Sequence, residues 1–172
     1  CWNGSIPQGQ QNEIIEIGLA VLDTKTGAIS QNKGLLIQPQ RSKVSPFCTE
    51  LTTITQELLD ENGVSFREAI NQLVDEYNPD SYTWASYGQY DLNMLKKQCK
   101  LFDVPYPMSN EHINVKVWFT ELFGLQKPTG MNGALHLLNI PLEGTHHRGI
   151  DDAKNIAKIL YWCIQNNKKT TS

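Results

Sequence analysis

Residues 14–22 read IIEIGLAVL, a β-branched and aliphatic run that is typical of a largely buried strand. Turn-forming residues follow at 23–27 (DTKTG), and an extended pattern resumes over residues 28–37. Because a glycine stands at the tight position between two extended runs, the sequence predicts a β-hairpin here.

Helical and extended patterns alternate after this hairpin. Ser65 and Glu68 form a capping-box pattern ahead of an apolar helix face, and residues 82–86 (YTWAS) favour a short strand. This order of patterns predicts one α/β layered domain over residues 1–172 with a mixed sheet. The other elements expected are a strand at 112–115 and helices at 91–101, 116–123, 130–138 and 149–164.

Composition excludes several classes of protein. No apolar run approaches the roughly 18 residues of a membrane span, and the first residues lack the features of a signal peptide. The four cysteines are far apart and form no CxxC pair, so reduced thiols in a cytoplasm are expected. A net charge of −3 argues against a broad basic face for long nucleic acid, although an enzyme that holds one strand end remains possible.

The motif HRGIDD, residues 147–152, runs straight into the longest helical pattern. A helix start favours carboxylates, so Asp151 and Asp152 can be ordinary first-turn acids and His147 an ordinary loop histidine. The functional alternative is that Asp152 binds a divalent metal while His147 takes a proton from water. Zinc is disfavoured, because His146 and His147 have no cysteine or further histidine at ligand spacing.

A second candidate is Asp91, in the stretch SYGQYD where a strand hands over to a helix. Asp91 can be the N-cap of that helix, which is a favoured use of aspartate. Alternatively, it lies at the carboxyl end of a sheet strand, where open α/β sheets place their sites. Mg²⁺ prefers a few carboxylates together with water and phosphate oxygens, which fits the second possibility.

Together, these motifs resemble those of the DEDDh-type 3′–5′ exonucleases. Asp91 and the pair His147 and Asp152 correspond to the second and third motifs of that family. The similarity is greatest to the branch of the enhanced-RNAi and histone-mRNA-end exoribonucleases and their bacterial KapD-like relatives. It extends over nearly the whole chain, through NEIIEIG (12–18), SPFCTELT (45–52), ITQ (54–56), YGQYD (87–91) and HHRGIDDAKNIA (146–157).

The resemblance implies a ribonuclease H-like fold, a five-stranded mixed sheet flanked by helices. It also implies two Mg²⁺ or Mn²⁺ ions and release of nucleoside 5′-monophosphates from a single-stranded 3′ end, with RNA favoured over DNA. By position, Asp91 and Asp152 would be metal ligands and His147 the general base. Phe47, Thr53 and Ile54 would contact the terminal nucleotide, although apolar residues of this kind are more often core.

One departure from the family pattern concerns its first motif, Asp-x-Glu, which precedes a Cys-Trp pair. This chain opens with Cys1-Trp2 and has no carboxylate before Glu13. The first, central strand is therefore expected to be missing, and the exonuclease domain to be N-terminally incomplete. Two function classes stay open: an active exonuclease completed by upstream residues, and a nucleic-acid-binding or protein-interaction domain that has lost its metal site.

Overall fold

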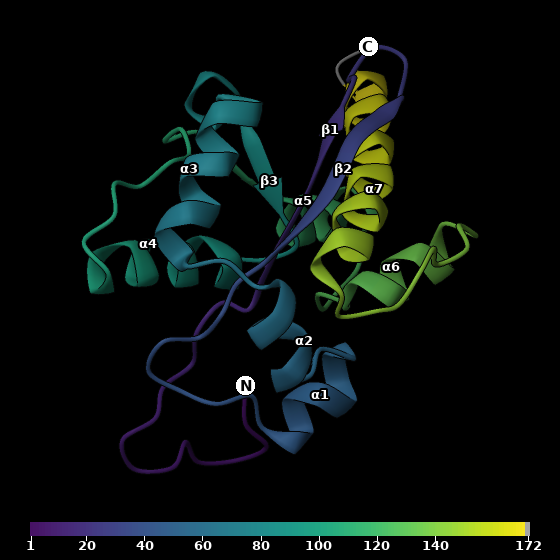
Figure 1. The fold of residues 1–172 in the computed structure, drawn as a ribbon. Coiled ribbons are helices and arrows are strands. Elements are labelled where there is room, and N and C mark those ends of the chain that lie inside the picture. The colour runs from purple at the N-terminus through teal and green to yellow at the C-terminus, as the bar shows by residue number, and fades with distance from the viewer. Residues whose placement is uncertain (171–172) are drawn as a thin grey trace.

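A computed structural model describes residues 1–170 of the chain, which form both strands and helices (Figure 1). The sequence prediction of an α/β domain is confirmed. The described range contains no helix both long and apolar enough to span a bilayer. The strands are β1 (Glu16–Leu22), β2 (Ile29–Leu36), β3 (Trp84–Ser86) and β4 (His112–Asn114). The helices are α1 (Pro46–Thr52), α2 (Gln56–Asn62), α3 (Phe66–Tyr77), α4 (Tyr90–Leu101), α5 (Val115–Phe123), α6 (Met131–Leu137) and α7 (Gly149–Thr170).

The predicted hairpin is present as β1 and β2, which pair antiparallel. Asp23 closes the turn because its Oδ1 accepts the backbone N–H groups of Lys25 and Thr26, and Gly27 supplies a positive φ of 79°. The register shifts between Leu19 and Val21, which marks an irregularity of the β-bulge type.

The four strands form two separate two-stranded sheets instead of one continuous five-stranded sheet. The first sheet is the hairpin, and the second pairs β3 with β4 in parallel, so the architecture is mixed. Within residues 1–170, β1 pairs only with β2 and β3 only with β4. One edge of β1 and one edge of β3 therefore carry no ladder partner among the described strands.

Helices cover the strands on opposite sides, α3 and α4 on one and α5, α6 and α7 on the other (Figure 1). Two hydrophobic clusters result. The first joins the hairpin to α3 and α4 through buried side chains such as Leu35, Phe66 and Leu95. The second joins α5, α6 and α7 through side chains such as Phe119 and Ile159. The predicted capping box is also present, since Ser65 and Glu68 bond reciprocally at the start of α3.

Candidate active site

Asp91 lies in the first turn of α4, just beyond the end of β3. Gly88, at φ 119°, turns the chain between strand and helix. The N-cap of α4 is Gln89 and not Asp91, so the capping role that the sequence also allowed does not explain this aspartate. Desolvation by the surrounding protein raises the pKa of the Asp91 carboxyl group, and the negative charge of Asp152 raises it further. The two carboxylates therefore lie within electrostatic reach of one another, although they come from different helices.

Asp152 lies in the first turn of α7. It follows the histidine turn, residues 145–148, which carries His146 and His147. Its Oδ1 lies 3.2 Å from His146 Nδ1 and accepts the His147 backbone N–H at 3.3 Å. The two imidazole rings stack with centroids 3.8 Å apart. Ligand atoms of these three residues all lie within 4.8 Å of one another, so they form a group that could hold a metal ion.

His147 is exposed and has a positive φ of 71°, a conformation that non-glycine residues rarely adopt. Partial burial lowers the pKa of its imidazole, the neighbouring His146 lowers it further, and Asp152 opposes both. The ring is thus biased towards its neutral form, which is the form that can accept a proton.

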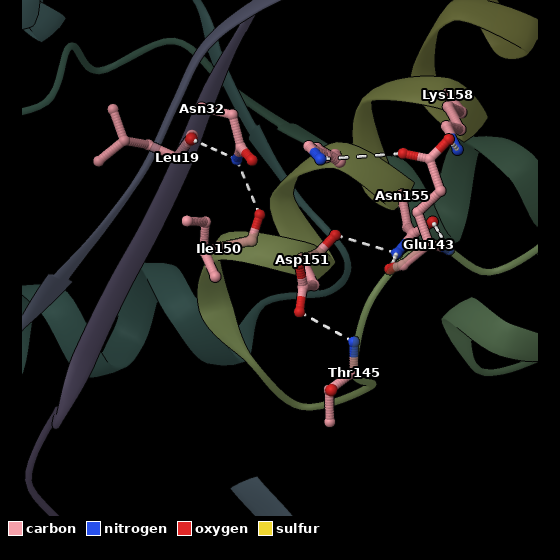
Figure 2. A network of polar contacts seen from close by, with 9 residues as sticks. Leu19, Asn32, Glu143, Thr145, Ile150, Asp151, Asn155 and Lys158 are labelled. Carbon is pink, nitrogen blue, oxygen red and sulfur yellow. Dashed lines mark hydrogen bonds and ion pairs between the residues drawn. The ribbon is translucent and has the colours of Figure 1, made fainter. Parts of the chain in front are cut away.

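The Asp151 side chain contacts the turn before α7 (Figure 2), whereas that of the adjacent Asp152 contacts the histidines. The Asp151 Oδ2 accepts the Thr145 backbone N–H at 2.8 Å, which closes the turn before α7. Asn155, fully buried, donates to the Asp151 carbonyl and also bonds both backbone groups of Glu143. Asp151 therefore holds the shape of the histidine turn, which leaves Asp152 as the acid available to a ligand.

The hairpin irregularity contributes to the same turn. Asn32, next to the register shift, points its side-chain amide at the start of α7 (Figure 2). The amide donates to the Leu19 carbonyl at 3.0 Å and to the Ile150 carbonyl at 2.7 Å. Sequence reasoning missed this residue because a polar side chain in an outer strand is usually solvated.

A buried ion pair anchors the other side of the turn. The Glu16 carboxylate, 4% exposed, accepts two N–H groups of the Arg148 guanidinium at 3.1 and 3.2 Å. It also accepts the Gly149 backbone N–H at 2.6 Å. The signal in the sequence was a glutamate within an apolar strand, since a buried charge needs a partner.

The three residues expected to contact the nucleotide differ in exposure. Phe47 is half-buried in α1, and Thr53 is exposed as the left-handed C-cap of that helix, with φ 63°. Ile54 is only 1% exposed, so its side chain is part of the core in this structure. Thr53 alone of the three bonds the histidine turn, because its Oγ1 lies 3.4 Å from an Arg148 nitrogen.

Tyr90 is a further candidate that the sequence did not single out. It directly precedes Asp91, and it is 64% exposed although it is a large aromatic residue. Exposed aromatic faces beside phosphate-handling groups are the usual platforms for stacking unpaired bases. Only the structure shows that this aromatic side chain is exposed at the start of α4, beside Asp91.

The sequence profile of the exonuclease (RNase T) family matches residues 4–160. The chain belongs to the exonuclease family. Its α/β architecture and the order of its elements agree with that assignment. Family members generally use divalent metal ions, and His146, His147 and Asp152 form a group that could hold one.

Known members of the exonuclease family extend the comparison. Human ERI1 exoribonuclease 2 is 30% identical over 190 residues, which is 96% of this chain and 27% of that protein. The probable 3′-5′ exonuclease KapD of Bacillus subtilis is 28% identical over 167 residues, 95% of this chain and 78% of KapD. The chain thus spans about a quarter of the human relative's length.

A solved member of the family has the same fold. The nuclease domain of 3′hExo, a DEDDh family member bound to rAMP, superposes with a TM-score of 0.84 at 28% identity. The match covers 96% of this chain and 86% of the solved one. The expected ribonuclease H-like fold and the resemblance to DEDDh exonucleases are therefore confirmed.

Proposed function

We propose that this chain is a 3′–5′ exonuclease domain acting on the single-stranded 3′ end of RNA. The proposal is supported chiefly by the charge of Asp152 in α7, which acts on Asp91 in α4, and by the His147 backbone N–H, which bonds Asp152. Support for RNA over DNA comes from the exoribonuclease names of relatives and from the rAMP bound to 3′hExo.

Asp91 and Asp152 are the proposed ligands for Mg²⁺ or Mn²⁺, two ions per complete site. The charge of Asp152 raises the pKa of Asp91, which means that the two carboxylates repel one another. A hard divalent cation would relieve this repulsion, since it prefers carboxylate oxygens as ligands. Divalent ions bound there would polarise the scissile phosphate and make water easier to deprotonate.

The reaction would need a base and a seat for the terminal nucleotide. We assign the base to His147, whose imidazole nitrogen would take a proton from the attacking water. Thr53, Phe47 and Ile54 would shape the nucleotide pocket, with Ile54 acting from beneath the surface. Tyr90 would stack the unpaired base.

The carboxylates of Asp91 and Asp152 carry two negative charges, against four positive charges on two divalent ions. We propose that an Asp-x-Glu strand supplies the remaining ligands. Such a strand would pair with the free edges of β1 and β3, joining two two-stranded sheets into one of five strands. Residues 1–172 would then be one exonuclease domain completed by that strand.

The decisive experiment compares purified folded chains with and without an N-terminal Asp-x-Glu strand. The completed chain should release nucleoside 5′-monophosphates from a single-stranded RNA end only when Mg²⁺ or Mn²⁺ is present. The 172-residue chain should release none, and Ala at either restored acid should abolish the activity again. Faster digestion of matched DNA would assign a DNA-directed exonuclease. RNA binding without digestion by the completed chain would favour a non-catalytic binding domain.

The cysteines support a cytoplasmic setting. All four are free, and three of them are buried. Burial raises the pKa of the Cys99 thiol to about 11 and that of Cys163 to about 12, which keeps both protonated and unreactive.

A further inference from the structure

The Arg148 side chain contacts two segments that are distant in sequence. Its Nε and Nη2 donate to the Glu16 carboxylate in β1, 132 positions away. Its Nη1 faces the Thr53 hydroxyl at 3.4 Å, 95 positions away. Arg148 itself lies between His147 and the first residue of α7. The guanidinium of Arg148 therefore contacts both Glu16 in β1 and Thr53, the C-cap of α1. The backbone of Arg148 continues the histidine turn.

The Glu16 contact fixes the orientation of this guanidinium. Glu16 is nearly inaccessible and uses both carboxylate oxygens on Arg148, a fork geometry that constrains the guanidinium plane. The same carboxylate holds the Gly149 N–H, so backbone and side chain of adjacent residues share one anchor. With the plane fixed, the remaining nitrogen has a defined direction towards Thr53.

Thr53 is itself constrained. A β-branched residue at φ 63° is sterically unfavourable, and such conformations persist only where surrounding contacts hold them. The Thr53 N–H bonds the Thr49 carbonyl, and its hydroxyl faces Arg148. A nucleotide seated against this exposed residue would press on a group whose hydroxyl partner is Arg148.

We propose that Arg148 is a positioning residue that couples the seating of the terminal nucleotide at Thr53 to the placement of His147. This inference rests on the proposed exonuclease function. Because Arg148 directly follows His147, a shift of the guanidinium moves the backbone that carries the imidazole. A correctly seated nucleotide stabilises the turn in its working geometry, and a poorly seated one leaves the base misplaced.

The first test uses the chain completed by the Asp-x-Glu strand and steady-state RNA digestion with Mg²⁺. Arg148→Lys keeps the charge but loses the fork, and we expect kcat to fall about ten- to a hundredfold, as misplacement of a catalytic group does. Thr53→Val removes only the hydroxyl and should lower kcat about tenfold, whereas Thr53→Ser should recover most of that loss. Arg67→Lys is the matched control, because Arg67 also donates to two acceptors but lies on α3, away from the site.

The double variant decides between coupling and independent roles. If Arg148 and Thr53 act as one unit, kcat of the double variant should lie within about threefold of Arg148→Lys alone. Two losses that multiply would overturn the proposal, as would a Thr53→Ser variant no better than Thr53→Val. A purely structural role would lower the folded fraction without producing this non-additivity.

A second readout needs no nuclease activity. Amide hydrogen exchange at Gly149, whose N–H bonds Glu16, should accelerate about tenfold or more in Arg148→Lys and stay unchanged in Arg67→Lys. Unchanged exchange at Gly149 in Arg148→Lys would overturn the positioning role. Absence of digestion by the completed chain without substitutions would instead refute the proposed function, and the two failures are thereby distinguished.

Discussion

Gly18 in β1 and Gly149 at the start of α7 meet backbone to backbone. A Cβ built on Gly18 would overlap the Gly149 carbonyl group, and one built on Gly149 would lie 2.8 Å from the Gly18 nitrogen. Neither position leaves room for a side chain. Helix α7 therefore reaches its place because two glycines allow strand and helix to touch.

We expect Gly18→Ala to lower the free energy of unfolding by about 3 kcal/mol, because the methyl group must push α7 away from β1. Chemical denaturation monitored by circular dichroism measures the effect. Gly130→Ala is a suitable control, since nothing lies within 4 Å of the added carbon. This control should lose no more than about 1 kcal/mol, the usual range for an N-cap change. Equal stability of Gly18→Ala and the unmodified protein would contradict the close approach.

The proximity of Asp91 and Asp152 can be measured in metal-free protein. Asp152→Asn removes the charge that contributes to the raised pKa of Asp91, so that pKa should fall. It should remain above the ordinary value of 3.8, because desolvation by the surrounding protein, the larger cause, is unchanged. A carbon-detected NMR titration of the Asp91 carboxyl provides the value. An identical Asp91 titration in both proteins would place the carboxylates too far apart to share an ion.

For the proposed base, His147→Ala in the completed enzyme should lower turnover by roughly 10²–10⁴-fold, the range for loss of a general base. Stability should change little, because His147 is exposed and its ring contact is to His146. His136→Ala, an exposed histidine on α6, serves as the control. A His147→Ala protein that unfolds yet keeps full activity per folded molecule would make the residue structural.

His112 gives the protein a stability that depends on pH. Burial lowers the pKa of its imidazole below 6.5, the nearby Lys96 lowers it further, and its Nε2 lies 2.9 Å from the Ser86 hydroxyl. The unfolded chain therefore binds a proton more readily, so this contribution is full above pH 6.5 and is lost as pH falls towards the folded pKa.

The measurement is the unfolding free energy at about pH 8 and about pH 5.5, with and without His112→Gln. Glutamine can keep a hydrogen bond to Ser86 but does not titrate. The unmodified protein should lose more stability on acidification than the variant does. Equal losses in the two proteins would show that His112 is not the group responsible.

Several elements followed directly from local sequence patterns. The hairpin, the capping box and the long final helix each depend on neighbouring residues, through turn chemistry at Asp23 and Gly27 and the reciprocal bonds of Ser65 and Glu68. The final helix is longer than predicted, since it continues to Thr170. Its polar end carries no apolar period, so the pattern could not mark where the helix stops.

The contacts around the site could not be predicted in the same way. Asn32, Glu16 and Thr53 bond to the histidine turn or the start of α7 across more than ninety positions, and only the fold brings them there. The split into two sheets also follows from tertiary pairing. The assignments to Asp91, His147 and Asp152 came from family motifs, because each residue alone had an ordinary structural explanation.

The two proposed metal ligands lie on helices that pack into different hydrophobic clusters. Asp91 lies in α4, which packs into the first cluster, whereas Asp152 lies in α7, which packs into the second. If Asp91 and Asp152 share an ion as we propose, the affinity for that ion depends on how the two clusters are positioned relative to each other. A substitution that weakens the contact between the two clusters should leave each cluster buried but lower the affinity of Asp91 and Asp152 for the ion. Conversely, a bound ion would hold the two clusters together.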